Sequence, residues 1–238
     1  MKIRIIIPAR LHSTRLPGKL LKKVNNKTLI EHIIRRAKKI SSDSLSVCTD
    51  HKDIKNLVDD LGINSFYSKR KFNNGTERIA FYVNHMNYKD TDLVINVQAD
   101  EFNFPLHAVK KMIKLFEKDK TIQTATVVVK SKDMRDFKDT NTVKVCIDAK
   151  SDALLFSRSK IPFNAKLFYK HIGIYAYRVS TLKKYMKFKR DTHEKNESLE
   201  QIRFLSNQIK MKCVTINSHE SISINTDNDL KLAKKKFK

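Results

Sequence analysis

The sequence begins with the stretch Ile3-Arg4-Ile5-Ile6-Ile7, which ends at Pro8. This run is short, apolar and rich in β-branched residues, which is typical of a strand buried on both faces of a parallel sheet. Apolar residues then recur at helical spacing over 29–40, a second strand-like run follows at 45–49, and a second helix is predicted over 54–61. Because strands and helices alternate, we expect an α/β fold with a mostly parallel, Rossmann-like sheet flanked by helices.

The alternation weakens beyond residue 120. Before that point, strand-like runs at 63–67 and 93–97 are each followed by a helical pattern, the first after Asn74-Gly75-Thr76 and the second over 106–116. Beyond it, strand-like runs dominate and cover 124–129, 142–147, 153–156 and 171–177. A helix at 199–205, a strand at 211–216 and a last helix from Asp229 towards Phe237 follow. We therefore predict one continuous unit in which a smaller β-rich lobe, at about 121–195, is inserted into the α/β core.

Composition excludes several classes of protein. No apolar run approaches the ~20 residues of a membrane-spanning helix, and the apolar run before Pro8 is too short for the core of a secretory signal. We therefore expect a cytoplasmic protein. Cys48, Cys146 and Cys213 are odd in number and widely separated, which fits neither a disulfide framework nor a paired-cysteine zinc site, so we expect reduced core residues.

The chain is strongly basic. Lysine and arginine outnumber aspartate and glutamate by 49 to 25, which gives a formal net charge of +24. A field of that sign attracts polyanions such as nucleic acid, anionic lipid or nucleotide phosphates. The lysines are spread along the whole chain, which favours a solvated lysine-rich surface over a dedicated nucleic-acid face. The sequence also contains neither an RNA-binding aromatic motif nor a zinc finger, so we do not expect nucleic acid as a partner.

The loop after the first strand is the first place to search for a site, because ligands bind at the carboxyl ends of the strands in open α/β sheets. It contains two arginines, two hydroxyls, a glycine and a lysine: Arg10, Ser13, Thr14, Arg15, Gly18 and Lys19. Guanidinium groups offer paired hydrogen bonds to phosphate oxygens, and lysine adds a compact charge. The loop is not a Walker A motif, since Leu20 follows Lys19 where Ser or Thr would be needed. These residues therefore leave two interpretations, a triphosphate cradle or a solvated basic loop.

Five segments carry motifs that become specific when they are taken together. Residues 8–19 contain Pro-Ala-Arg and then Ser-Thr-Arg-Leu-Pro-Gly-Lys. Four further blocks follow: Asn-Gly-Thr-Glu-Arg at 74–78, Val-Gln-Ala-Asp-Glu at 97–101, His-Ile-Gly-Ile-Tyr-Ala-Tyr-Arg at 171–178 and Leu-Glu-Gln-Ile-Arg at 199–203. Their sequence and order resemble those of the 3-deoxy-manno-octulosonate cytidylyltransferases, the CMP-Kdo synthetases of lipopolysaccharide assembly. The resemblance covers nearly the whole chain.

The resemblance implies a reaction, a cofactor and a set of site residues. The anomeric hydroxyl of the sugar acid would attack the α-phosphorus of CTP and release pyrophosphate, with Mg²⁺ as cofactor. The positions that match nucleotide-binding residues are Ala9, Arg10, Arg15, Lys19, Asn74, Thr76 and Arg78. The positions that match sugar-binding residues are Gln98, His171, Tyr175, Glu200 and Gln201. Asp100 matches a magnesium ligand, and together with Arg10 and Lys19 it would be catalytic.

The resemblance also implies an organisation of the chain. Residues 1–120 and 196–238 would form the nucleotide-binding core, while the lobe at about 121–195 would serve sugar binding and dimerisation in a homodimer. Taken singly, each site residue also has an ordinary structural explanation: His171 and Tyr175 could pack beside a strand, and Glu200 and Gln201 could face solvent on a helix.

One departure from the family pattern concerns the metal. The family carries a second metal-binding aspartate where this chain has Asn225, and an amide oxygen supplies no charge, so Mg²⁺ should bind more weakly unless Asp227 replaces the missing ligand. Asp229 would cap the last helix. Three alternatives stay open: a modified sugar such as the 8-amino analogue, another acidic sugar resembling sialic acid, or a non-catalytic basic module that binds nucleic acid.

Overall fold

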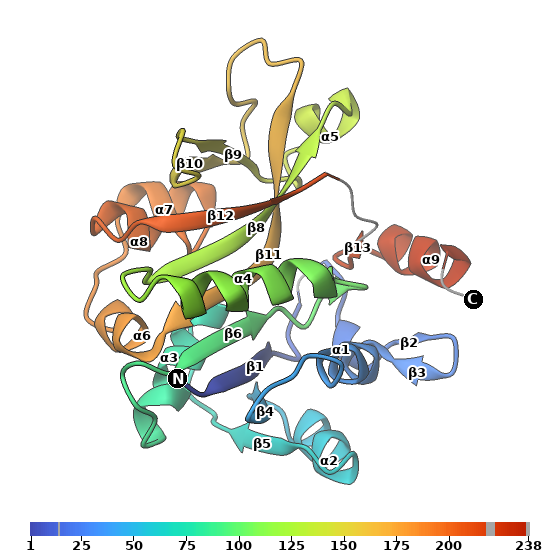
Figure 1. The fold of residues 1–238 in the computed structure, drawn as a ribbon. Coiled ribbons are helices and arrows are strands. Elements are labelled where there is room, and N and C mark those ends of the chain that lie inside the picture. Colours follow the sequence, from blue (N-terminus) through green and yellow to red (C-terminus); the bar gives the residue numbers. More distant parts are fainter. Residues whose placement is uncertain (14, 218–221, 237–238) are drawn as a thin grey trace.

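The computed structural model describes residues 1–13, 15–217 and 222–236, and these build a nine-stranded mixed sheet with helices on both faces (Figure 1). One half of the sheet is parallel and has the order β6-β1-β4-β5. Its strands are β1 (Ile3–Ala9), β4 (Ser44–Thr49), β5 (Asn64–Tyr67) and β6 (Leu93–Val97). The predicted α/β architecture is therefore confirmed.

The isoleucine run of β1 explains why both faces of the sheet are covered. Ile5 and Ile7 belong to one hydrophobic cluster and Ile6 to the other, as the period of two in a strand requires. The first cluster also takes in the apolar faces of α1 (Leu29–Ala37), α2 (Lys52–Asp60) and α4 (Leu106–Lys118), and the second takes in α3 (Gly75–His85) and α6 (Val179–Tyr185). Figure 1 shows α3 and α4 on opposite faces of the sheet.

The other half of the sheet continues directly from β6. The long strand β11 (Phe168–Arg178) pairs antiparallel with both β6 and β8 (Thr124–Ser131), and β12 (Met211–Ile216) pairs parallel with β8. The strands expected in a lobe at about 121–195 thus share one sheet with the core. The far edge of this sheet is formed by β9 (Lys144–Ile147) and β10 (Ala153–Ser157), and it projects at the top of Figure 1 together with the short helix α5 (Met134–Lys138) and the segment 158–167.

Several short elements were not predicted, because two to seven residues show too little periodicity. They are the 3-10 turn η1 (Lys19–Leu21), the β2–β3 hairpin (Lys23–Val24 and Lys27–Thr28), β7 (Glu101–Phe102), β13 (Ile222–Ser223), α5, α6 and α7 (Thr192–Glu197). The helix predicted at 199–205 is shorter than expected and forms α8 (Ile202–Ser206). Antiparallel pairing of β13 with β7 joins the C-terminal segment to the loop that follows β6.

The last helix, α9 (Asp227–Lys236), begins two residues earlier than predicted, and the prediction that Asp229 is its cap was wrong. Asp229 Oδ2 accepts from the backbone N–H of Thr226 at 2.8 Å, while Thr226 Oγ1 accepts from the N–H of Asp229 at 3.2 Å. These reciprocal bonds form a capping box, in which Thr226 is the cap and Asp229 is its acidic partner in the first turn. Phe237 and Thr14 lie outside the described residues.

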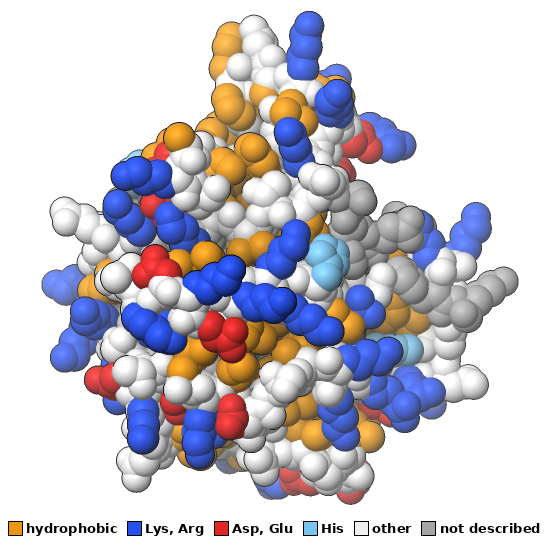
Figure 2. Space-filling model, viewed as in Figure 1, with side chains coloured by type: hydrophobic (Ala, Val, Ile, Leu, Met, Phe, Trp, Pro, Cys, Tyr) orange, Lys and Arg blue, Asp and Glu red, His pale blue; other side chains and the backbone are white. Residues whose placement is uncertain are grey.

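The expectation that the cysteines are reduced core residues is confirmed for two of the three. Cys48 and Cys213 are buried, Cys146 is half-buried, and all three are free thiols. Within the described ranges no helix is long and apolar enough to cross a membrane. Figure 2 shows lysines and arginines spread over one face together with acidic side chains, with a row of these basic side chains along the middle of that face.

Candidate active site

A cleft of about 890 Å³ lies at the carboxyl ends of β1 and β6, between β11 and the first turn of α9. Most of the predicted site residues line it: Arg10, Arg15, Lys19, Asn74, Arg78, Gln98, Asp100, His171, Tyr175, Glu200, Gln201 and Asn225. Ala9, Thr76 and Asp227 are not part of its wall. Ala9 is buried at the end of β1, Thr76 is buried in the first turn of α3, and Asp227 is exposed on α9.

The basic loop after β1 enters the cleft through a glycine turn. Gly18 has φ +63°, a left-handed conformation that glycine adopts without strain, and η1 follows directly. This turn buries Lys19, which is 8% exposed, while Arg10 and Arg15 remain exposed. Arg15 Nη1 donates to Asn141 Oδ1 at 2.7 Å, so the loop also contacts the segment before β9. The loop therefore presents two exposed guanidinium groups and one buried ammonium group.

The ammonium group of Lys19 lies between the two residues predicted to bind a metal. Its Nζ is 2.6 Å from Asp100 Oδ2, 3.2 Å from the backbone oxygen of Ile224 and 3.4 Å from Asn225 Oδ1. The three oxygens thus surround one point, and a carboxylate, an amide and a carbonyl are all acceptable ligands for Mg²⁺ when phosphate oxygens or water complete its shell. No group of three or more His, Cys, Asp or Glu side chains in the described part of the chain is arranged to bind a metal by itself.

Arg78 also lines the cleft, from the first turn of α3. Its Nη2 donates to Asp50 Oδ2 at 2.7 Å, and its guanidinium lies 5.2 Å from the ring centroid of Phe72. Asp50 also accepts from the N–H of Leu11 at 3.2 Å, which connects Arg78 to the basic loop. Asp50 was not predicted as a site residue, although it directly follows a parallel strand and the rule that identified the loop after β1 applies equally to it.

The wall expected to bind a sugar is held together by Glu200. Glu200 Oε1 accepts from Gln98 Nε2 at 2.9 Å, and Oε2 accepts from the backbone N–H of Thr76 at 2.8 Å. Burial raises the pKa of Glu200. Next to it, Tyr175 donates its hydroxyl to Gln201 Oε1 at 3.2 Å. Glu200 and Gln201 are therefore interior hydrogen-bonding groups, and the alternative that they face solvent on a helix was wrong.

His171 is half-buried in the wall of the cleft. Burial lowers its pKa to about 3. Thr126 Oγ1 donates its only hydrogen to the backbone oxygen of Ile174 at 2.8 Å, so it accepts from His171 Nε2, 2.9 Å away. This arrangement places the proton of the ring on Nε2 and leaves Nδ1 as an acceptor.

Glu101 is a further residue of the cleft to which the sequence assigned no role. Its Oε1 accepts from Ser223 Oγ at 2.7 Å and from the N–H of Gly173 at 3.1 Å. Burial and the neighbouring charge of Asp100 raise its pKa to about 7. A Cβ atom on Gly173 would lie 2.9 Å from Oε1, so a larger residue there would require the Glu101 side chain to move.

Three buried polar atoms of cleft residues have no partner among the described residues. They are Arg78 Nη1, Gln201 Nε2 and Glu101 Oε2, which are two donors and one carboxyl oxygen. Buried polar groups are nearly always hydrogen-bonded in folded proteins, and exceptions in a cleft point to a ligand or solvent partner. The cleft therefore has the properties of a binding site for a polar molecule with both donors and acceptors.

Comparisons with known proteins agree with this geometry. Two relatives named 3-deoxy-manno-octulosonate cytidylyltransferase match the full chain. That from Fusobacterium nucleatum is 39% identical, over 97% of this chain and 94% of its own, and that from Francisella tularensis is 35% identical, over 99% and 98%. A solved CMP:2-keto-3-deoxy-manno-octonic acid synthetase complexed with CTP is 29% identical, covers 99% of this chain and 98% of its own, and superposes with a TM-score of 0.90.

A more distant structure supports the fold alone. A putative glucose-1-phosphate thymidylyltransferase from Bacillus anthracis is 14% identical, covers 98% of this chain and 94% of its own, and has a TM-score of 0.71. The family model described as cytidylyltransferase matches residues 4–216. Since that model covers most of the chain and the named relatives match its whole length, the chain belongs to the cytidylyltransferase family.

Proposed function

We propose that this chain transfers CMP from CTP to 3-deoxy-manno-octulosonate and releases pyrophosphate. The observation that supports this most is the composition of the cleft at the carboxyl ends of β1 and β6. One side offers the cationic groups of Arg10, Arg15 and Lys19 beside Asp100, and the other offers the neutral donors and acceptors that suit a polyhydroxylated acid. Both relatives named above bear the name of this activity, and the solved neighbour was complexed with CTP.

The basic loop would bind the triphosphate. Arg10 and Arg15 can each donate two hydrogen bonds to phosphate oxygens, and Lys19 adds a charge that is partly shielded from water, where it acts more strongly. Ala9 would contribute through its backbone, whereas Asn74, Thr76 and Arg78 would position the nucleotide from the first turn of α3. Catalysis would then consist mainly of placing the sugar hydroxyl in line with the α-phosphorus and neutralising the charge of the leaving pyrophosphate.

Mg²⁺ would bind where Asp100 Oδ2 and Asn225 Oδ1 already face one point. When bound, Mg²⁺ would neutralise phosphate charge and polarise the reacting phosphoryl group. Asp100 would be the anionic ligand and Asn225 a neutral one, while Asp227, the exposed first residue of α9, does not line the cleft. Lys19 would leave Asp100 for the phosphates as the cation binds.

The sugar would lie against Gln98, His171, Tyr175 and Gln201. Gln201 Nε2 is a donor without a partner among the described residues, and His171 Nδ1 is an acceptor, so this wall can bind hydroxyl groups in both directions. Glu200 would act by fixing Gln98 and the first turn of α3. Selectivity against another sugar acid follows from the hydroxyl pattern that these groups can satisfy.

A homodimer would cover an exposed apolar surface on the projecting part of the chain. Leu154, Leu155, Phe163 and Leu167 are all exposed there, and Phe163 is 88% exposed. A protein interface would remove these apolar side chains from water. Sedimentation measurements should therefore give a dimer, and Phe163→Ser should weaken it. A monomeric wild-type protein would contradict this assignment. The cytoplasmic location, which is a separate point, remains a prediction from sequence.

A substrate panel tests the proposed activity. Purified protein would be incubated with CTP and Mg²⁺ or Mn²⁺, together with 3-deoxy-manno-octulosonate, its 8-amino analogue or a sialic acid, and both pyrophosphate and the CMP-sugar would be measured. We expect both products with the octulosonate. Turnover only with the 8-amino analogue, or only with sialic acid, would mean that the sugar substrate differs from the one proposed while the reaction is the same. Absence of any CMP-sugar, combined with tight and strongly salt-dependent RNA binding, would instead support the basic binding module.

A further inference from the structure

Arg203 lies outside the cleft but joins two segments that form its wall. It is 3% exposed, and its Nε and Nη2 donate to the two carboxylate oxygens of Glu194, each at 2.6 Å. The same Nη2 donates to Glu77 Oε1 at 2.8 Å. Its guanidinium also lies 4.4 Å from the ring centroid of Tyr185. One buried cation therefore links α8 to α7, through Glu194, and to the first turn of α3, through Glu77.

Both carboxylates of this cluster also accept hydrogen bonds from the residues just before α3. Glu77 accepts from the backbone N–H of Asn73 at 2.9 Å, and Glu194 Oε1 accepts from Asn74 Nδ2 at 3.3 Å. Asn74 Nδ2 also lies 3.2 Å from the hydroxyl oxygen of Tyr185, while its Oδ1 caps the helix by accepting from the N–H of Glu77 at 2.8 Å. Every polar atom of the Asn74 side chain is thus used to hold the start of α3 in place.

The first turn of α3, which these bonds hold in place, is closely packed. A Cβ atom on Gly75 would lie 3.1 Å from both Pro8 Cγ and Gln98 Nε2, so the backbone of α3 packs directly on the ends of β1 and β6. The next residue, Thr76, donates its N–H to Glu200. A small shift of this turn would therefore move Arg78 and the backbone that faces the cleft.

We propose that Arg203 is a positioning residue for CTP: it holds the first turn of α3 at the distance from the basic loop that the nucleotide requires. This rests on the proposed function, in which residues 74–78 bind the nucleotide. Arg203 contacts no substrate in this arrangement. Its effect reaches the nucleotide through Glu77 and Glu194, and it should appear in the binding of CTP more than in stability alone.

Two substitutions weaken the cluster in different ways. Arg203→Lys keeps the charge, but an ammonium group cannot reproduce a planar fork that bonds both oxygens of Glu194 and Glu77 together. In Glu77→Gln, at a less buried position, one acceptor oxygen becomes an amide donor, so either Arg203, which bonds Oε1, or the N–H of Asn73, which bonds Oε2, loses its acceptor. Each variant should raise KM for CTP about tenfold and change kcat much less. Glu77→Gln keeps the test valid if Arg203→Lys does not fold.

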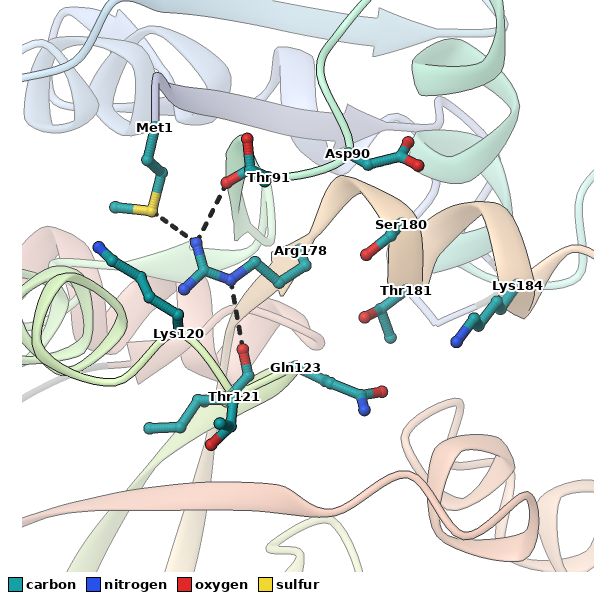
Figure 3. Close-up of a pocket in the computed structure, with 11 residues that line it drawn as sticks. Met1, Asp90, Thr91, Lys120, Thr121, Gln123, Arg178, Ser180, Thr181 and Lys184 are labelled. Atoms are coloured by element: carbon teal, nitrogen blue, oxygen red, sulfur yellow. Dashed lines mark hydrogen bonds between the residues drawn. The ribbon is translucent and has the colours of Figure 1, made fainter.

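A second buried arginine provides a matched control. Arg178 is 6% exposed and donates to the backbone oxygens of Phe116 at 2.8 Å, Thr91 at 3.1 Å and Ile122 at 3.3 Å. Figure 3 shows it in a different cavity, of about 440 Å³, whose wall contains no residue of the active cleft. Arg178→Lys should lower the melting temperature and leave KM for CTP unchanged, which separates loss of stability from loss of positioning.

The decisive measurement is a double-variant comparison. Asn74→Ser keeps a short helix cap but no longer reaches Glu194, so it should raise KM for CTP by itself. If Arg203 acts through this turn, KM for CTP in the double variant Arg203→Lys/Asn74→Ser should be no higher than in the single variant that binds CTP more weakly. If the two residues act independently, their effects on KM should multiply. Multiplied effects, or a KM for CTP that stays within about twofold of wild type in both Arg203→Lys and Glu77→Gln, would overturn the inference. If Arg78→Ala also leaves KM for CTP unchanged, the proposed nucleotide site itself is wrong; if Arg78→Ala raises it, only the role of Arg203 is lost.

Discussion

Replacing Lys19 by methionine removes one charge from the centre of the cleft and keeps most of the side-chain volume. In the structure its ammonium group is almost fully buried and is 2.6 Å from Asp100 Oδ2. In the proposed reaction the same group binds the triphosphate, whose charge must be neutralised as pyrophosphate leaves. The variant therefore tests whether the loop after β1 is a phosphate site or only a basic surface loop.

The expected loss of kcat follows from the removal of a buried, preorganised charge. Removal of one preorganised contact to a developing charge commonly lowers kcat by ~10²-fold or more, and a factor of 100 equals about 2.7 kcal/mol of transition-state stabilisation. A second effect has the opposite sign. Without the ammonium group, Asp100 loses its internal cation, so the Mg²⁺ concentration that gives half-maximal activity should fall.

The assay is pyrophosphate release from CTP with 3-deoxy-manno-octulosonate, measured over a range of Mg²⁺ concentrations. Lys23→Met is the matched control, because Lys23 is exposed on β2 and does not line the cleft. We expect a large loss of kcat and a lower Mg²⁺ requirement for Lys19→Met, with neither change for Lys23→Met. Turnover of Lys19→Met within a fewfold of the control would refute the assignment of this loop to the phosphates.

Three other substitutions address the metal, the glycine contact and the histidine of the cleft. Asn225→Asp adds a carboxylate beside Asp100, so half-maximal activity should need about tenfold less Mg²⁺; an unchanged Mg²⁺ titration would place the metal elsewhere. Gly173→Ala puts a methyl group 2.9 Å from Glu101 Oε1. Urea unfolding should show that the free energy of unfolding falls by about 1–3 kcal/mol, and KM for the sugar should rise. Wild-type values of both quantities would show that Glu101 moves freely. Burial lowers the pKa of His171 from 6.5 in the unfolded chain to about 3. As the pH drops from about 6.5 towards 3, the unfolded state therefore binds this proton first, and the stability of the folded protein falls. This fall in stability should be shallower in His171→Gln, and equal slopes in the two proteins would mean that His171 is protonated in the folded protein.

The alternating pattern predicted the main elements because it reflects burial directly. The β1 run was expected to be buried on both faces, and Ile5 and Ile6 do enter separate hydrophobic clusters. The continuity of the sheet through β11 was not predictable in the same way. Pairing of β11 with β6 depends on contacts between residues about eighty positions apart, such as Tyr175 with Asn96, and no local periodicity reports such a pairing.

Most of the residues proposed from the sequence line the cleft, but their hydrogen-bond partners were not predictable. The motifs identified Glu200 and Asn74 as substrate-contacting positions, but the structure shows their polar atoms bonded to Gln98, Thr76, Glu77 and Glu194. A motif reports which residues occur together, and it does not distinguish a ligand contact from a support for one. Asp50 shows the reverse case, since it has no motif but follows a parallel strand whose carboxyl end lies at the cleft.

The two sides of the cleft are mechanically linked by one carboxylate. Glu200 accepts from Gln98 on the sugar side and from the N–H of Thr76 on the nucleotide side, and it is held in turn by the hydroxyl of Tyr185, which donates to its backbone oxygen at 3.2 Å. Because a displaced carboxylate would release both partners, a substitution at Glu200 should raise KM for CTP and for the sugar together. A change at Gln201 should affect the sugar alone, since the hydrogen bond that its side chain makes within the described part of the chain is to Tyr175 on the sugar side. Steady-state kinetics with each substrate varied in turn would compare Glu200→Gln with Gln201→Ala, and a selective sugar defect in both would show that the two sides of the cleft act independently.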